Sequence, residues 1–222
     1  MASSFQFKSS LLYLNPFSLR YYDFFAGLLN RIAWRCPQER LRADYHHYVG
    51  PNHLEVGAKT GKMLDQLNRD TRSLRLSLID LNLWSLKAAK KRLARYTPNV
   101  YQLNIFADDT PIAERFDSIA LNRVLQNIPQ GFYAKGILFY HLQKLLKPHG
   151  VLFGSTVVAK GCQHNLLSLA FLKIFNMIGL LQNREDSVLE LEKALKAYFR
   201  DVKIDVVGST VLFSAQHSRM SS

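Results

Sequence analysis

Short apolar runs alternate with helix-like stretches over most of this chain, and that alternation is what most constrains the fold. After Pro51 the apolar runs lie at residues 53–57, 74–80, 100–103, 116–121, 151–156, 202–207 and 211–215. Helical patterns cover residues 62–69, 85–95, 136–146, 166–178 and 187–199, and a Pro-His-Gly turn is expected at 148–150. Near-continuous apolar strands separated by helices are typical of a parallel sheet covered on both faces. The last two apolar runs are joined by a short segment, Gly-Ser-Thr, and predict an antiparallel hairpin at one edge of the sheet.

The first part of the chain has a different character. Residues 11–48 are rich in aromatic side chains and mostly helical in pattern. An apolar helical face that must be covered is formed by Leu28, Leu29, Ile32 and Ala33. This helix either packs on the core or forms a lid over a ligand site. We therefore divide the chain into an N-terminal helical extension at 1–48 and an α/β domain at 49–222.

Charge and composition narrow the class of partner. Of 222 residues, 48% are hydrophobic and 21% charged, as in an ordinary globular protein, while the formal net charge is +12. The basic residues are scattered, which argues against a nucleic-acid partner. Cys36 and Cys162 are far apart and form no metal motif, so we expect no metal and a reducing compartment. No stretch has the length to span a bilayer and no signal-peptide core is visible, so we expect a cytoplasmic protein. The sequence gives no indication of the oligomeric state.

The segment at residues 53–64 has the features of a ligand-binding loop. An apolar run ends near Glu55, Gly57 and Gly61 follow, and a helical pattern starts next. A strand, a glycine turn and a helix N-terminus together let the backbone approach a ligand closely. Lys59 stands at the middle position, where such loops usually have a third glycine. A lysine there occupies space and adds positive charge.

These patterns resemble the class I S-adenosylmethionine-dependent methyltransferases over residues 45–216. The resemblance rests on Leu-Glu-Val-Gly at 54–57, Leu-Ile-Asp-Leu-Asn at 78–82, Phe-Asp-Ser-Ile at 116–119 and Leu-Lys-Pro-His-Gly-Val-Leu at 146–152. It implies a Rossmann-like, doubly wound sheet of seven strands, mostly parallel, with an antiparallel C-terminal hairpin. More narrowly, residues 34–37, 183–186, 207–208 and 212–213 resemble small methyltransferases of microbial secondary metabolism.

The resemblance implies roles for particular residues. The cofactor-binding residues would be Glu55, Gly57, Gly61, Asp80 and Asn104. Asp80 follows Glu55 by about 25 residues, where a carboxylate accepts hydrogen bonds from both ribose hydroxyls, as in dinucleotide-binding folds. The alternative role for Asp80 is a helix cap, because Asn82 and Ser85 follow it. Asn122, at the end of a strand, would stand where substrate and cofactor meet.

Several positions depart from the family pattern. Lys59 replaces a glycine, and Lys62 stands where an aromatic residue is more usual. Asn104 replaces an acidic residue that usually accepts a hydrogen bond from the adenine amino group of the cofactor. Asn can still accept a hydrogen bond, but without negative charge. A cation near the sulfonium and amino group of the cofactor would repel both, at a cost of about 4 kcal/mol for a 4 Å separation and an effective dielectric near 20.

Our first hypothesis is therefore a repurposed enzyme that needs no cofactor. It would promote the cyclisation or pericyclic rearrangement of an apolar substrate, a reaction that depends on orientation and on a hydrogen-bond donor. The candidate catalytic residues are Lys59, Lys62, Asn122, Arg123 and Gln126. The candidate substrate-contacting aromatic residues are Tyr21, Tyr22, Phe24 and Phe25, and for each of them plain core packing is the alternative.

Two other hypotheses stay open. The second is a methyltransferase that uses S-adenosylmethionine to modify a small secondary metabolite, with Lys59 turned outward or paired with Glu55 or Asp80. His164 would then be able to reach the substrate, although no partner that would make it a base is visible. The third is a non-catalytic binding protein that keeps the fold.

Overall fold

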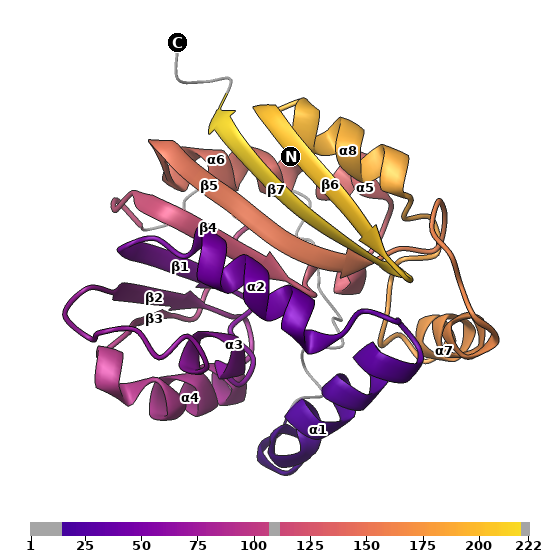
Figure 1. Ribbon diagram of the computed structural model, residues 1–222, viewed down its shortest axis with the longest axis horizontal. Coiled ribbons are helices and arrows are strands. Elements are labelled where there is room, and N and C mark those ends of the chain that lie inside the picture. The colour runs from indigo at the N-terminus through magenta and orange to yellow at the C-terminus, as the bar shows by residue number, and fades with distance from the viewer. Residues whose placement is uncertain (1–14, 107–111, 219–222) are drawn as a thin grey trace.

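The computed structural model describes residues 15–106 and 112–218 (Figure 1). Its centre is one sheet of seven strands in the order β3-β2-β1-β4-β5-β7-β6. The strands are β1 (Asn52–Val56), β2 (Arg75–Ile79), β3 (Asn99–Tyr101), β4 (Phe116–Asn122), β5 (Leu146–Val157), β6 (Phe199–Val207) and β7 (Thr210–Ser218). Strands β1 to β5 run parallel, whereas β7 pairs antiparallel with both β5 and β6. The predicted doubly wound fold with an antiparallel C-terminal hairpin is confirmed.

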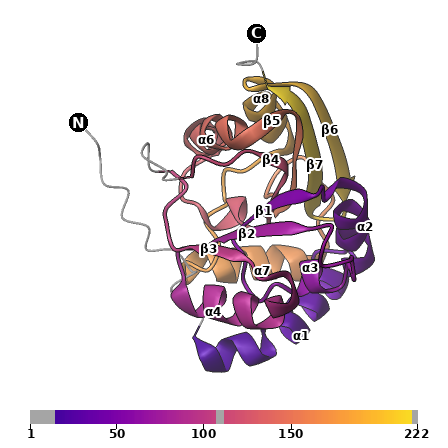
Figure 2. The same ribbon diagram turned by 90° about the vertical axis from the view of Figure 1, so that its left-hand side faces the viewer.

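Helices cover both faces of this sheet. They are α1 (Pro16–Ile32), α2 (Gln38–Tyr48), α3 (Lys62–Asp65), α4 (Leu83–Arg92), α5 (Phe132–Lys135), α6 (Ile137–Leu145), α7 (Leu166–Met177) and α8 (Val188–Lys196). Figure 2 shows α2 and α3 on one side of the sheet and α6 and α8 on the other. One core cluster joins α2, α3 and α4 to the sheet, and a second joins α5, α6 and α8 to its other face. The central strands are therefore buried on both sides, as their apolar sequences require.

Two local predictions were wrong. The helix expected at 62–69 is the single turn of α3, because Asn68 adopts a left-handed φ of 47° and breaks the helical path. The turn expected at 148–150 lies within β5, where extra residues bulge between two pairings of that strand with β4. Leu146 pairs with Phe116 and Val151 with Ser118, so the intervening residues loop out without ending the strand.

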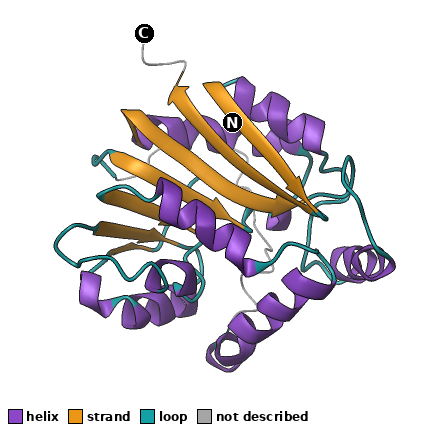
Figure 3. Cartoon of the chain, in the orientation of Figure 1, coloured by secondary structure: helices purple, strands orange, loops and turns teal. Residues whose placement is uncertain are grey.

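The sheet topology places a crevice where β1 and β4 lie side by side. The chain continues from β1 towards β2 on one side and from β4 towards β5 on the other, so the strand order reverses at this point. In open α/β sheets ligands bind outside the carboxyl ends of the strands at such a switch point. Figure 3 shows α1 and α7 at the end of the sheet towards which the parallel strands point. These two helices are tied together by Trp34, whose ring makes edge contacts with Phe171 and Phe175.

Helix α7 is apolar but short. Leu166 and Met177 on this helix are largely exposed. Its twelve residues rise far less than the thickness of a bilayer. Across residues 15–106 and 112–218, no helix combines the length and apolar character that a membrane span needs.

The pairing of β4 with β5 next to the crevice depends on Gly154. A Cβ at this position would lie 2.2 Å from the carbonyl oxygen of Leu121, which belongs to the backbone and cannot move aside. We expect Gly154→Ala to lower the free energy of unfolding by about 2 kcal/mol or more, measured by urea denaturation. Gly131→Ala is the control, because a Cβ there meets only Glu185 at ordinary contact distance. Equal losses in the two variants would contradict this account of the strand pairing.

Candidate active site

The loop after β1 is a tight turn that contacts β4 and α4. Gly57 and Gly61 have φ angles of 78° and 70°. A Cβ on Gly57 would lie 2.4 Å from Val124 Cγ2, and one on Gly61 would lie 2.8 Å from Leu93 Cδ1. Both positions therefore require glycine for conformation and for space. Lys59 has a φ of 48°, also in the left-handed region, although it carries a side chain.

The Lys59 side chain spans the crevice to the end of β4. Its Nζ donates hydrogen bonds to the backbone carbonyl oxygens of Asn122 at 3.1 Å and Arg123 at 3.2 Å. The ammonium is thus neither turned outward nor paired with the carboxylate of Glu55 or Asp80. Two carbonyl dipoles compensate part of its charge, and the side chain forms a wall shared by two neighbouring pockets.

The end of β2 carries a buried carboxylate. Asp80 Oδ1 accepts the backbone N–H of Asn82 at 2.9 Å, and Oδ2 accepts that of Lys59 at 3.2 Å. Burial raises the pKa of the Asp80 carboxyl. The cap of α4 is Asn82, whose side chain accepts the N–H groups of Trp84 and Ser85. Asp80 is therefore not the helix cap considered above.

Asp80 stands at one side of a narrow apolar pocket, which we call the β2 slot. It is lined by Val56, Gly57, Ile79, Asp80, Leu81, Leu103, Asn104, Ile105, Phe106, Val124, Asn127 and Ile128. Asn104 is one of its lining residues, and its Oδ1 accepts the backbone N–H of Phe106 at 3.1 Å. The lining of the β2 slot thus combines aliphatic side chains with a carboxylate and an amide, which suits a flat, partly polar group.

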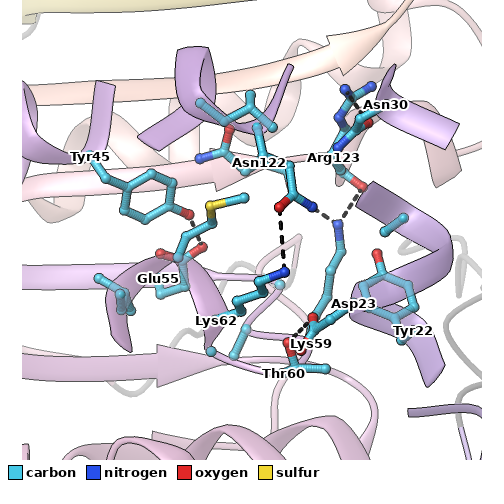
Figure 4. A pocket seen from close by; sticks show the side chains of 18 residues that line it. Tyr22, Asp23, Asn30, Tyr45, Glu55, Lys59, Thr60, Lys62, Asn122 and Arg123 are labelled. Carbon is cyan, nitrogen blue, oxygen red and sulfur yellow. Dashed lines mark hydrogen bonds between the residues drawn. The ribbon is translucent and has the colours of Figure 1, made fainter. Parts of the chain in front are cut away.

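A second pocket, the central pocket, shares Gly57 with the β2 slot. Figure 4 shows Tyr45 and Glu55 together on one side of it and Asn30 and Arg123 on the other, with Lys59 and Lys62 between them. The remaining lining residues are Tyr22, Asp23, Ala26, Gln38, Leu41, Gly57, Ala58, Thr60, Gly61, Met63, Leu64 and Asn122. The Nζ of Lys62 lies 3.4 Å from Gln38 Oε1, a long hydrogen bond.

Glu55 belongs to a buried hydrogen-bond chain. Its Oε1 accepts the Tyr45 hydroxyl at 2.7 Å, and its Oε2 lies 3.4 Å from His53 Nε2. The other ring nitrogen of His53 lies 2.7 Å from Ser118 Oγ. Burial, and next the Glu55 carboxylate, hold the pKa of Tyr45 well above its usual value, so the phenol remains a donor. This chain fixes the Glu55 carboxylate at the end of β1.

Arg123 is the first residue after β4, and its φ is 56°. Its Nη2 donates to Asn30 Oδ1 at 2.7 Å. Its Nε and Nη1 are buried and have no hydrogen-bond partner among the described residues, and the same holds for Asn122 Nδ2. Burial lowers the pKa of the Arg123 guanidinium. Three donors at the end of β4 thus lack acceptors.

A third pocket, the aromatic pocket, lies beyond Lys59 under α1 and has a volume of about 260 Å³. It is lined by Tyr22, Phe25, Ala26, Leu29, Asn30, Trp34, Lys59, Arg123, Gln126, Asn127, Phe175, Leu180 and Leu181. Gln126 is held by its Oε1, which accepts the N–H of Val157 at 2.9 Å. The lining of this pocket therefore combines aromatic rings with polar groups.

The structure separates the residues predicted for the site. Those that line the three pockets are Tyr22, Phe25, Glu55, Gly57, Lys59, Gly61, Lys62, Asp80, Asn104, Asn122, Arg123 and Gln126. Tyr21 and Phe24 lie outside these pockets on the exposed side of α1. His164 also lies outside them, with Nδ1 3.0 Å from Ser209 Oγ and Nε2 3.0 Å from Ala159 O. Its hydrogen bonds hold the loop after β5 against the β6–β7 turn.

Sequence reasoning missed Asn30 and Tyr45. Asn30 could have been found, because Tyr22, Ala26 and Asn30 recur every four residues and share one face of α1. The same face carries Asp23, which contacts Thr60 Oγ1 at 2.6 Å and Arg92 at 2.7 Å and so fastens α1 over the loop. Tyr45 could not have been found, because its link to Glu55 depends on how α2 packs on the sheet.

Comparisons with known proteins agree with this geometry. A family model described as a methyltransferase domain matches residues 54–152. Methyltransferase aurB of Calcarisporium arbuscula is 34% identical over 221 residues, covering 93% of this chain and 96% of that protein. The physcion biosynthesis cluster O-methyltransferase of Aspergillus chevalieri is 30% identical over 210 residues, covering 93% and 94% respectively. A similar solved structure is that of N-methyltransferase NodS from Bradyrhizobium japonicum WM9 in complex with S-adenosyl-l-homocysteine. Its TM-score is 0.59 at 17% identity, and the match covers 81% of this chain and 84% of that chain. This is a likeness of fold.

We expect the Tyr45–Glu55 contact to stabilise the protein. Tyr45→Phe leaves a buried carboxylate oxygen without its donor and should lower the free energy of unfolding by about 1–3 kcal/mol. Tyr48→Phe is the matched control, because the Tyr48 hydroxyl donates to the neutral Ser214 hydroxyl at 3.1 Å in a less buried place. Its loss should stay below about 1 kcal/mol in the same denaturation experiment. If Tyr48→Phe lowers the free energy of unfolding as much as Tyr45→Phe does, the hydrogen bond from Tyr45 does not stabilise the buried Glu55 carboxylate.

Proposed function

Because the chain belongs to the class I S-adenosylmethionine-dependent methyltransferases and is an enzyme of that fold, we propose that it transfers a methyl group from S-adenosylmethionine to a small molecule of secondary metabolism. The observation that carries this proposal is the arrangement of the pockets around one loop. The β2 slot and the central pocket share Gly57, and the central and aromatic pockets share Lys59. A cofactor and an acceptor can therefore lie end to end along the crevice.

The residues of the β2 slot fit the adenosine part of this cofactor. Asp80 accepts hydrogen bonds from the backbone N–H groups of Asn82, Lys59 and Leu81, and its two carboxylate oxygens still offer lone pairs to ribose hydroxyls. The aliphatic side chains that line the slot, Leu103 and Ile128 among them, suit a flat base. When bound, S-adenosylmethionine supplies an electrophilic methyl group on a sulfonium.

The contribution of the chain would be binding and alignment. Methyl transfer from a sulfonium depends chiefly on proximity and in-line geometry. Tyr22, Phe25 and Trp34 would hold an apolar acceptor against the end of β4. Helix α1 contributes Tyr22, Ala26 and Asn30 to the lining of both the central and the aromatic pocket, which supports the lid interpretation of the N-terminal segment.

The cofactor-independent cyclase hypothesis loses its main argument. It rested on an uncompensated lysine charge where the cofactor would lie, whereas the Lys59 ammonium donates to two carbonyl oxygens. The relatives named above are methyltransferases, which favours the second hypothesis over the first. We therefore propose that the protein uses S-adenosylmethionine.

Calorimetric titration tests the cofactor first. We expect S-adenosylmethionine and S-adenosylhomocysteine to bind with micromolar dissociation constants. Asp80→Asn should weaken the binding of S-adenosylhomocysteine at least about tenfold, because hydrogen bonds to a charged acceptor contribute about 1.5–3 kcal/mol. Asp70→Asn is the control, since Asp70 lies in an exposed turn. The absence of binding by the wild-type protein at millimolar ligand would overturn the proposed function.

Lys59 should discriminate between the two forms of the cofactor. S-adenosylmethionine carries a sulfonium charge and S-adenosylhomocysteine does not. The Lys59 ammonium should therefore make the affinity for S-adenosylmethionine about three- to tenfold weaker than that for S-adenosylhomocysteine. Lys59→Met removes the charge and keeps most of the volume, and should abolish that difference. Lys59→Gly also opens space and should strengthen the binding of both forms. An unchanged ratio of the two dissociation constants in Lys59→Met would show that the ammonium does not act on the sulfonium.

A further inference from the structure

The end of β4 holds a half-buried cation that has no carboxylate partner among the described residues. Arg123 Nη2 donates a hydrogen bond to the neutral amide of Asn30, while Nε and Nη1 have no partner in the described part of the chain. Besides burial, the groups that affect the Arg123 pKa are Cys36 and Tyr22, neither of which is a carboxylate. A buried charge is costly unless it is paired, and unmade hydrogen bonds add to that cost. An anionic group of a ligand would supply the missing counter-charge.

The lining of the aromatic pocket shows the chemistry of that partner. Among the described residues that line it, Lys59 and Arg123 carry positive charge, and none is aspartate or glutamate. The carboxylates of the central pocket are already committed. Asp23 bonds Arg92 and Thr60, and Glu55 bonds Tyr45. The lining of the aromatic pocket thus combines two positive charges with aromatic and aliphatic side chains.

We propose that Arg123 binds an oxyanion of the methyl acceptor, so that the acceptor is an aromatic or otherwise apolar molecule with an acidic oxygen, such as a carboxylic acid, an acidic phenol or an enol. This inference rests on the proposed function, because it identifies the substrate class of the same site. The unpartnered Nδ2 of Asn122 lies next to Arg123 in the sequence and lines the adjoining central pocket.

The proposal also explains how transfer would proceed without a base in the aromatic pocket. Its described lining contains no histidine and no carboxylate, while lysine and arginine are donors. The acceptor would enter already ionised, having lost its proton to solvent. A lone pair of its oxygen would form the new O–C bond to the methyl group as the C–S bond breaks, and that electron pair would stay on sulfur. The neutral thioether S-adenosylhomocysteine and a neutral methyl ester or ether would leave.

The test uses 2-naphthoate and its neutral isostere 2-naphthamide as probes. Each is titrated calorimetrically into the wild-type protein, with and without saturating S-adenosylhomocysteine. We expect the carboxylate to bind at least about tenfold more tightly than the amide, since a hydrogen bond to a charged group contributes about 1.5–3 kcal/mol. Equal affinities would overturn the proposal, and this comparison needs no variant. Failure of the proposed function and failure of this inference give different results. The binding of S-adenosylhomocysteine tests the proposed function, and the preference for 2-naphthoate over 2-naphthamide tests this inference.

Variants assign the preference to Arg123. Arg123→Met should reduce it to less than about threefold, and Arg123→Lys should keep part of it, because lysine retains the charge without the guanidinium geometry. Arg200→Met, on the exposed side of β6, removes the same charge away from the pockets and should leave the preference unchanged. If Arg123→Met keeps the full preference, Arg123 is not the anion site.

The carboxylate of the cofactor is the other possible source of the anion. To distinguish it, S-adenosylhomocysteine is compared with 5′-methylthioadenosine, which lacks the amino-acid part. We expect Arg123→Met to bind both within about twofold of the wild-type values, because the guanidinium serves the acceptor. A tenfold loss of affinity for S-adenosylhomocysteine alone would assign Arg123 to the cofactor and overturn the proposal.

Discussion

The contact between the loop after β1 and the end of β4 is the constraint on which the site depends. Gly57 packs so closely on Val124 that no side chain fits between them. Two residues further on, the Lys59 ammonium joins the two strands by donating to the carbonyl oxygens of Asn122 and Arg123. This contact divides the crevice into pockets, because the lysine side chain is a wall of both the central and the aromatic pocket.

The charged groups around this contact differ in how well they are compensated. Glu55 accepts hydrogen bonds from its own fold, and Asp80 does the same while facing the β2 slot. Lys59 uses carbonyl dipoles in place of a carboxylate. Arg123 alone among these four keeps buried donors without acceptors. Since folding leaves that charge uncompensated, its position is better explained by a ligand than by stability.

The two enzyme hypotheses differed on one physical question, namely whether a lysine in the glycine loop excludes a sulfonium cofactor. Sequence position indicates that the charge is near the cofactor, but not what neutralises it. The left-handed φ of Lys59 directs its side chain along the crevice to the end of β4. With its charge shared by carbonyl groups, the lysine narrows the site without closing it, and the shared ancestry with methyltransferases favours retained cofactor use.

The sequence by itself determined the α/β fold, the antiparallel hairpin and the candidate loop, because periodic burial and glycine spacing are local properties of the chain. Asp80 and Arg123 became candidates through the resemblance to the methyltransferase family, which implies that their positions face the cofactor and substrate pocket. Only the tertiary structure decided that Tyr45 holds Glu55, that Tyr22 rather than Tyr21 faces the pockets, and that His164 lies outside them. Those outcomes depend on helix rotation and on packing between segments far apart in the chain, which no local pattern encodes.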